Sequence, residues 1–263
     1  MALWVGEVVT NFPTGPGIYR LRLKAPIEET KPGQFVHLRC GSGYDPLLRR
    51  PLSIHDFDPG KQEIEFLYRV VGKGTAWLAA RVPGERISGL GPLGRGFVVP
   101  FGKRLALVAG GMGLAPLFFL AREAVAQGNR VTFYQGARSR NYLLRERELA
   151  ELGVELEIAT EDGSAGFTGL VTDLLADQIT SQQFDGIFAC GPRDMLAVVA
   201  SLAATHLIPA QVSLEEHMAC GLGACRGCAV PIYQEDGNLT YENVCSEGPV
   251  FPAHRVAWDV FGR

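Results

Sequence analysis

Hydrophobic and polar residues alternate over short stretches in the first hundred residues of the chain. The apolar runs are only a few residues long, and turns rich in proline and glycine separate them, which is typical of antiparallel strands. The clearest runs are Ile18–Leu23, Phe35–Leu38 and Ile64–Val71. This pattern predicts a small antiparallel β-barrel over residues 1–100.

The pattern changes at Arg104. Leu105–Ala109 is a continuous apolar run, as expected of a buried strand, and a glycine-rich turn and an apolar helix through about Gln127 follow it. Strand and helix patterns then alternate, with strands at Val131–Tyr134, Val154–Ala159 and Gly186–Cys190 and helices at about Leu143–Leu152, Leu170–Gln178 and Met195–Thr205. Such alternation predicts a doubly wound parallel sheet with helices on both faces, a nucleotide-binding domain over residues 101–210.

From about Gln211 the pattern dissolves into a loop and a short tail that contain four cysteines. Cys220, Cys225, Cys228 and Cys245 show the spacing C-x4-C-x2-C with a distant fourth cysteine, which is typical of plant-type [2Fe–2S] ligands. Glycines at positions 221, 223 and 227 allow the loop to wrap closely and to turn backbone N–H groups toward sulfur. The spacing predicts a small iron–sulfur domain over residues 211–263.

Structural zinc, disulfides and buried free thiols are the alternatives for these cysteines. Zinc ribbons usually contain two C-x2-C pairs, and this chain has one. Residues 1–20 show no basic stretch leading into an apolar run, so we expect no signal peptide and a cytoplasmic protein whose thiols stay reduced. A Rieske centre needs two histidines, and only His217 is nearby. Cys40 and Cys190 are expected to be small buried apolar residues.

Composition narrows the classes of function. The chain has 263 residues, of which 47% are hydrophobic and 20% charged, which is enough for two or three domains. The net charge is −3, and no basic run interleaves with aromatic residues, so we expect no nucleic-acid partner. Leu105–Ala121 is a long uncharged stretch, but glycines and Pro116 interrupt it, so we expect no membrane span.

The first predicted domain contains the sequence R-R-P-L-S-I at residues 49–54. Pro51 restricts the backbone, Arg50 offers a bidentate fork suited to pyrophosphate, and Ser53 places a hydroxyl where a flavin ring nitrogen could bind. An ordinary Arg-Pro edge strand is the alternative. The segment Tyr68–Thr75 then forms a strand and a glycine turn before a predicted helix at Ala76–Arg81, a geometry that offers N–H groups to phosphate.

The second predicted domain contains G-G-M-G-L-A-P at residues 110–116, between a strand and a helix. Open α/β sheets bind nucleotides at such strand ends, although Pro116 stands where the usual fingerprint has its last glycine, so a plain tight turn is the alternative. A second strand end, Cys190-Gly191-Pro192, could border the same crevice. Arg138 and Arg140 follow another strand, and the sequence leaves open whether they bind a 2′-phosphate or are solvated charges.

Taken in order, the motifs R-R-P-L-S, G-K-G-T, G-G-M-G-L-A-P and C-G-P resemble those of the ferredoxin reductase family of flavoproteins. The segment E-E-H-M-A-C-G-L-G-A-C-R-G-C at residues 215–228, with C-x-x-G-P-V-F from Cys245, resembles the electron-transfer subunits of two-subunit, NAD-dependent dihydroorotate dehydrogenases. The resemblance covers nearly the whole chain. It implies electron transfer in pyrimidine biosynthesis, from a separate FMN-containing catalytic subunit through a [2Fe–2S] cluster and FAD to NAD⁺, in a heterotetramer.

The resemblance also implies a role for each matching residue. The residues implied to bind FAD are Arg50, Pro51, Leu52, Ser53, Tyr68, Arg69, Val70, Gly74 and Thr75, with Ser53 the catalytic position beside the flavin ring. The residues implied to bind NAD are Gly111, Gly113, Cys190 and Gly191, and the cluster ligands are Cys220, Cys225, Cys228 and Cys245. Because a cluster moves single electrons, nicotinamide accepts a hydride and a flavin does both, this order of cofactors is chemically consistent.

Two other functions stay open at this point. A related NAD(P)H-dependent ferredoxin or sulfide oxidoreductase subunit would have the same domains, but its clusters often have an aspartate ligand, which is absent from this motif. A redox-sensing module without turnover would keep the cluster and lose the flavin. The sequence also leaves open whether Val250, Phe251 and Trp258 form a docking surface for a partner or pack within the terminal domain.

Overall fold

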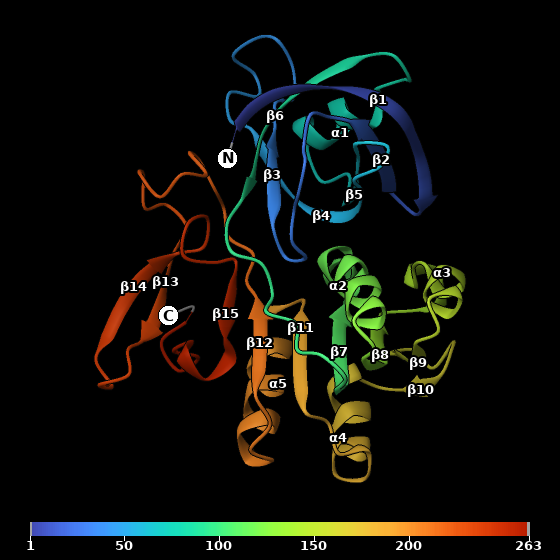
Figure 1. Cartoon of the computed structure of the whole chain (residues 1–263), viewed down its shortest axis with the longest axis vertical. Helices are drawn as coiled ribbons and strands as arrows, with labels where there is room; N and C mark the ends of the chain where they lie inside the picture. The colour runs from blue at the N-terminus through green and yellow to red at the C-terminus, as the bar shows by residue number, and fades with distance from the viewer. Residues whose placement is uncertain (1, 262–263) are drawn as a thin grey trace.

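The computed structural model describes residues 2–261 as three units, a barrel, a nucleotide-binding sheet and a C-terminal cysteine unit (Figure 1). Among those residues no helix is long and apolar enough to cross a membrane. The three units are the ones expected from the sequence.

The first unit is a closed antiparallel barrel with the strand order β1-β2-β5-β4-β3-β6. Its strands are β1 (Ala2–Gly15), β2 (Ile18–Lys24), β3 (Phe35–Leu38), β4 (Arg50–Asp58), β5 (Glu63–Arg69) and β6 (Arg86–Leu93), and helix α1 (Lys73–Ala79) follows β5. Side chains alternate along each strand, so Val36 and Leu38 of β3 pack in the barrel core while Phe35 packs outside it. The predicted β-barrel is confirmed.

The second unit is a seven-stranded sheet with the order β10-β9-β8-β7-β11-β12-β15. Its strands are β7 (Arg104–Gly110), β8 (Arg130–Ala137), β9 (Glu155–Thr160), β10 (Phe167–Thr168), β11 (Gly186–Cys190), β12 (Ala210–Ser213) and β15 (Val250–Pro252). All neighbours are parallel except the pair β12 and β15. The parallel sheet that the alternation predicted is confirmed.

Helices cover both faces of this sheet. They are α2 (Leu114–Ala126), α3 (Glu146–Glu151), α4 (Val171–Gln182) and α5 (Arg193–Thr205). Side chains of α2 and α3 share one hydrophobic cluster with the sheet, and those of α4 and α5 share the cluster on the other face. The predicted helix over residues 143–152 is shorter than expected, because Arg145 adopts a left-handed backbone (φ 59°) that no helix can include.

The expectation that regular structure ends at about Gln211 is wrong. Strand β12 runs across the predicted boundary at residue 210, the hairpin of β13 (Ala229–Tyr233) and β14 (Leu239–Asn243) follows, and β15 returns to the sheet. These strands have three to five residues, too short for an alternating pattern to stand out among cysteines, glycines and prolines.

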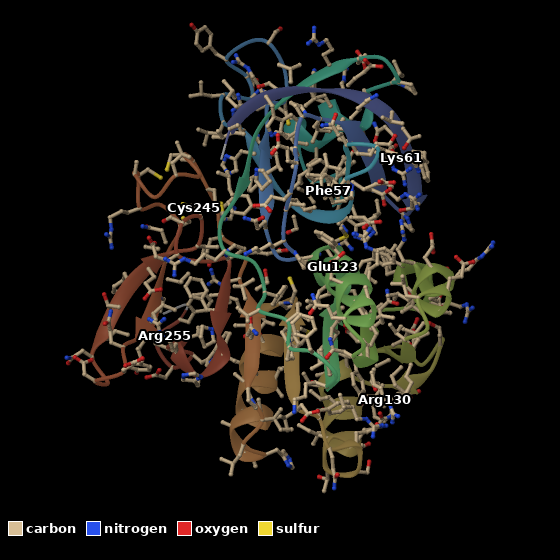
Figure 2. All side chains as sticks on the ribbon, viewed as in Figure 1. Phe57, Lys61, Glu123, Arg130, Cys245 and Arg255 are labelled. Carbon is tan, nitrogen blue, oxygen red and sulfur yellow. The ribbon has the colours of Figure 1, made fainter. Side chains whose placement is uncertain are left out.

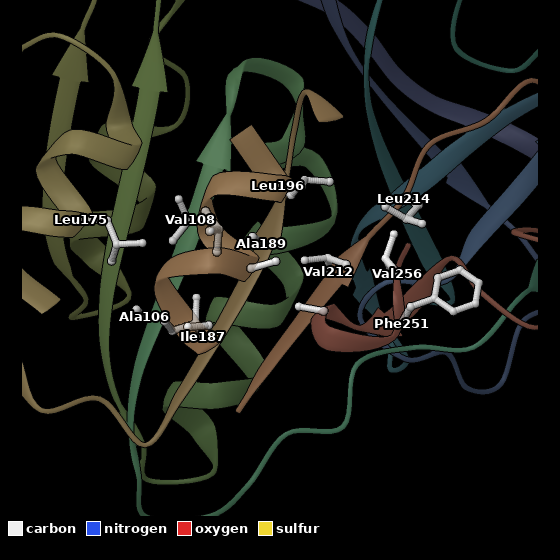
Figure 3. Packing of buried hydrophobic residues seen from close by; sticks show 14 of the residues in the cluster. Ala106, Val108, Leu175, Ile187, Ala189, Leu196, Val212, Leu214, Phe251 and Val256 are labelled. Atoms are coloured by element: carbon white, nitrogen blue, oxygen red, sulfur yellow. The ribbon is translucent and has the colours of Figure 1, made fainter. Parts of the chain in front are cut away.

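Phe251 and Trp258 pack inside the C-terminal part of the chain. Phe251 is 1% exposed and lies with Val212 and Val256 in the cluster that joins β12, β15 and the terminal segment (Figure 3). The Trp258 ring packs against the same cluster and its Nε1–H donates to the Ala253 carbonyl. Packing, rather than a docking surface, is therefore the role of both aromatics.

A buried carboxylate joins the barrel to the nucleotide-binding unit. Glu65 of β5 is 3% exposed and lies within 3.3 Å of three guanidinium groups, those of Arg20, Arg22 and Arg145. Arg20 and Arg22 belong to the barrel, whereas Arg145 lies at the start of α3. Burial alone would raise the pKa of Glu65, but the surrounding cationic groups hold it below its ordinary value.

His55 makes a second connection between the same two units. Its ring is fully buried beside Phe118 of α2, and its Nδ1–H donates to the Ala115 carbonyl at 2.8 Å. Burial, and next the charge of Arg145, lower the pKa of His55 to about 4, so the ring is neutral at pH 7. In the unfolded chain its pKa returns to about 6.5.

His55 therefore makes folding stability dependent on pH. Between pH 6.5 and 4 the unfolded chain binds the proton and the folded chain does not, so stability falls as the pH falls through this window. From pH 7 to pH 5 the loss due to His55 is about 2 kcal/mol. Urea unfolding at both pH values should show a smaller loss in His55→Asn than in the wild type, whereas the exposed His254→Asn should keep the wild-type loss. An unchanged pH dependence in His55→Asn would contradict this account.

Candidate functional site

The larger of two neighbouring cavities, about 650 Å³, opens at the carboxyl ends of β7, β8 and β11. Its wall includes Gly111 and Gly113 after β7, Arg138 after β8 and Gly191 after β11. Helices α2 and α5 both begin at this wall, so their unpaired N–H groups and positive dipole ends face it. Parallel sheets bind dinucleotides in this position.

Gly113 is needed here because two strand ends approach each other. A Cβ on Gly113 would lie 1.9 Å from the carbonyl oxygen of Cys190, so any side chain would force β7 and β11 apart. Cys190 itself is fully buried, and burial raises the pKa of its thiol well above the ordinary value. Of the four residues implied to bind NAD, Gly111, Gly113 and Gly191 line the cavity, whereas Cys190 is buried and is not part of its wall.

The smaller cavity, about 320 Å³, runs along β4 and β5 of the barrel. Seven of the nine residues implied to bind FAD line it, namely Arg50, Pro51, Leu52, Ser53, Tyr68, Arg69 and Thr75. Val70 and Gly74 are outside its wall. Gly74 instead lies under Arg50, since a Cβ there would come within 2.6 Å of the Arg50 Nε, and the Arg50 guanidinium is further held by the Leu48 carbonyl at 2.6 Å.

The Thr75 hydroxyl is occupied by the backbone of its own turn. It accepts hydrogen bonds from the N–H groups of Val71 and Gly72 at the start of α1 and donates to the Gly72 carbonyl. Thr75 therefore shapes the turn that borders the cavity, as a capping residue does.

The two cavities meet. Arg69, Met112 and Glu215 line both of them, so molecules bound in the two cavities would be in contact there. The sequence analysis quoted Glu215 within a motif but gave it no role. Among the described residues, Glu215 is the one acidic residue that lines both cavities, and it lies there because it follows β12 by two residues.

The four cysteines of the terminal unit come together as two pairs. Cys225 lies beside Cys220, and Cys245 lies beside Cys228. Among the described residues, no three cysteine, histidine or acidic side chains are close enough to hold a single metal ion. Two pairs of thiolates suit two iron atoms with two protein sulfurs each, whereas tetrahedral zinc needs four ligands around one centre. The arrangement therefore fits a two-iron cluster better than zinc.

Backbone N–H groups of the cysteine loop point at these sulfurs. Those of Leu222 and Cys225 donate to the Cys220 sulfur at 3.3 and 3.4 Å, and that of Gly223 donates to Cys245 at 3.1 Å. These donors lower the pKa of Cys220 to about 6, which favours the thiolate that metals bind. Burial raises the pKa of the Cys245 thiol to about 12.

The cysteine loop borders the smaller cavity. Met218, two residues before Cys220, and Pro249, four residues after Cys245, both line it. Figure 2 shows Cys245 on the side of the C-terminal unit nearest the barrel. The two candidate redox sites of the chain are therefore neighbours.

Comparisons with known proteins agree with this geometry. The iron–sulfur cluster binding domain of dihydroorotate dehydrogenase B matches residues 215–257, and the oxidoreductase NAD-binding domain matches residues 107–201. The dihydroorotate dehydrogenase B (NAD(+)) electron transfer subunit of Desulforamulus reducens is 42% identical over 256 residues, covering 96% of this chain and 97% of that protein. The chain belongs to this family. The electron transfer subunit of Geobacillus sp. is also 42% identical, over 95% of this chain and 96% of its own.

Solved structures place the family within the ferredoxin reductase fold. An NADH-dependent reduced ferredoxin–NADP oxidoreductase gives a TM-score of 0.86 at 31% identity, covering 97% of this chain and 91% of that one. A ferredoxin NADP+ reductase from Neisseria gonorrhoeae, solved with FAD and NADP, gives 0.67 at 18% identity over 78% of this chain and 92% of that one, which shows the shared fold alone. The chain is thus an oxidoreductase component with an NAD-binding domain and an iron–sulfur domain.

Proposed function

We propose that this electron transfer subunit carries electrons from a [2Fe–2S] cluster through FAD to NAD⁺ on behalf of a dihydroorotate-oxidising partner. The observation that carries the proposal is the convergence of three sites. The barrel cavity shares Arg69, Met112 and Glu215 with the nucleotide cavity, and Met218 and Pro249 beside the cysteine loop line it as well. When bound, the cluster exchanges single electrons, FAD exchanges one or two, and NAD⁺ accepts a hydride.

The residues of each cavity suit those cofactors. The Arg50 guanidinium is the group proposed to bind the FAD pyrophosphate, since it lies at the cavity wall and offers paired N–H donors. Ser53, on the same strand, is proposed to hold the flavin ring by a hydrogen bond. Gly111 and Gly113, at the start of α2, are proposed to receive the NAD phosphates. Glu215, which lines both cavities, is proposed to orient the nicotinamide.

Two charged side chains of the nucleotide cavity bear on the choice between NAD and NADP. Arg138 and Glu161 both line that cavity, at the ends of β8 and β9. A carboxylate accepts hydrogen bonds from ribose hydroxyls and repels a 2′-phosphate, so Glu161 favours NAD.

The proposed partner is an FMN-containing catalytic subunit, in a cytoplasmic heterotetramer. The barrel cavity, the nucleotide cavity and the cysteine loop are assigned to FAD, NAD and the cluster, which leaves the FMN and the dihydroorotate site to a partner. Each of the six cysteines, all within the described residues, is free of a disulfide, which fits a reducing compartment.

The flavin assignment predicts different effects for Arg50→Ala and Ser53→Ala. Arg50→Ala should release FAD, because it removes a charged contact to pyrophosphate. Ser53→Ala should retain FAD but slow hydride exchange with NADH, since a lost hydrogen bond near the reactive ring costs about 1–3 kcal/mol. Flavin absorbance per chain and stopped-flow reduction by NADH measure the two effects. Arg39→Ala, whose guanidinium donates to the nearby Gly41 and Ser42 carbonyls, serves as the control. Full flavin occupancy in Arg50→Ala would count against its assignment.

The ligand assignment predicts that Cys225→Ser loses or weakens the cluster while FAD content and NADH-to-dye activity stay largely intact. The reason is that Cys225 lies outside both cavities. Iron and acid-labile sulfide analysis, with the cluster absorbance, checks this. Cys40→Ser, in the barrel core, should keep the wild-type iron content. A normal cluster in Cys225→Ser, or zinc in place of iron in the wild type, would overturn the assignment.

The proposed function itself is tested by reconstitution. The chain loaded with FAD and cluster should oxidise NADH with artificial acceptors but show no dihydroorotate-to-NAD⁺ activity. Addition of an FMN-containing dihydroorotate dehydrogenase subunit from the same source should restore NAD⁺ reduction, followed at 340 nm. If the two proteins do not associate, and a ferredoxin or sulfide donor supports NAD(P)⁺ reduction instead, the related oxidoreductase is the better function.

A further inference from the structure

A buried histidine lies between the barrel cavity and the cysteine loop. His37 of β3 is 0% exposed, and its ring centroid is 5.7 Å from that of Phe35, which lines the barrel cavity. On its other side is Gly221, the residue after Cys220. A Cβ on Gly221 would lie 3.0 Å from the His37 Cε1 and 3.1 Å from both ring nitrogens. The part of the ring that carries the nitrogens therefore faces the cysteine loop.

Neither nitrogen of this ring has a hydrogen-bond partner among the described residues. An imidazole has at least one N–H group in either protonation state, and a buried unpaired donor destabilises a fold substantially. The neighbouring Arg49 does not serve the ring, because its guanidinium donates to the His37 backbone carbonyl and to Ser88. The missing partner must be an acceptor on the side of the loop.

We propose that a ring N–H of His37 donates a hydrogen bond to a sulfur of the iron–sulfur cluster in the cysteine loop. The inference rests on the proposed cluster ligands Cys220, Cys225, Cys228 and Cys245. The loop already turns the N–H groups of Leu222 and Gly223 toward sulfur, and His37 adds a donor from the barrel. The flavin is the less suitable acceptor, because Phe35, and not His37, lines the barrel cavity.

Such a bond gives His37 a specific effect on electron transfer. A donor to sulfur stabilises the reduced cluster, which is the more negative form, and so raises its reduction potential. His37 thus raises the reduction potential of the cluster relative to that of the flavin. It also accounts for glycine at position 221, where the backbone is left-handed (φ 72°) and a side chain would displace the ring.

The first test compares reduction potentials in the full chain loaded with FAD and cluster. His37→Phe should retain its iron but show a lower cluster potential in an EPR-monitored titration, with the FAD potential unchanged. His37→Gln, which keeps an N–H donor, should recover most of the shift. His55→Asn, a buried histidine that faces α2 instead, should keep the wild-type cluster potential. An unchanged cluster potential in His37→Phe, or a shift of the FAD potential alone, would overturn the inference.

The second test needs no folded variant at position 37. Wild-type chain labelled with ¹⁵N-histidine should show a histidine nitrogen coupling to the reduced cluster in pulsed EPR, and the coupling should persist in His217→Asn, whose exposed side chain is the other imidazole close to the loop in sequence. Absence of the coupling, or its loss in His217→Asn, would rule out His37. If the purified chain contains no iron–sulfur cluster, both the proposed function and this inference are wrong. If the cluster is present but shows no histidine coupling, this inference alone is wrong.

Discussion

The pairing of β12 with β15 is the interaction on which the arrangement of the candidate sites depends. Gln211, Val212 and Ser213 pair antiparallel with residues 250–252, so the chain leaves the sheet edge after β12 and returns to the same edge some forty residues later. The Leu214 N–H donates to the Pro249 carbonyl and closes the base of this excursion. The excursion contains Glu215 and all four loop cysteines, and its residues Met218 and Pro249 line the barrel cavity.

The junction of barrel and sheet holds the barrel cavity and the nucleotide cavity next to each other. Glu65 binds guanidinium groups from both units, and His55 donates to the carbonyl of Ala115, in the first turn of the helix that opens the nucleotide cavity. Removing one partner of a buried ion pair usually costs about 3–5 kcal/mol, so this junction resists rearrangement. Because the cavities share their wall, a rigid junction keeps their contents in contact.

Local sequence determined the elements and the donor groups of the sites. Alternation of period two predicted the barrel, continuous apolar strands between helices predicted the parallel sheet, and the spacing of Cys220, Cys225, Cys228 and Cys245 indicated two-iron ligation. These features depend on residues that are close together in the chain, such as those of the glycine turn that ends at Gly113. They can therefore be recognised in the sequence before the fold is known.

Only the tertiary structure decided how the sites meet. His37 has an ordinary place in a strand, and its significance comes from Gly221, which is 184 residues away along the chain. Glu215 is one of several acidic residues in the sequence, and it becomes distinctive because it lines both cavities. Burial and long-range strand pairing create these relations, and they depend on packing between residues that no local pattern connects. The sequence therefore determined which chemistry the chain could carry, and the packing of its three units decided where that chemistry is placed.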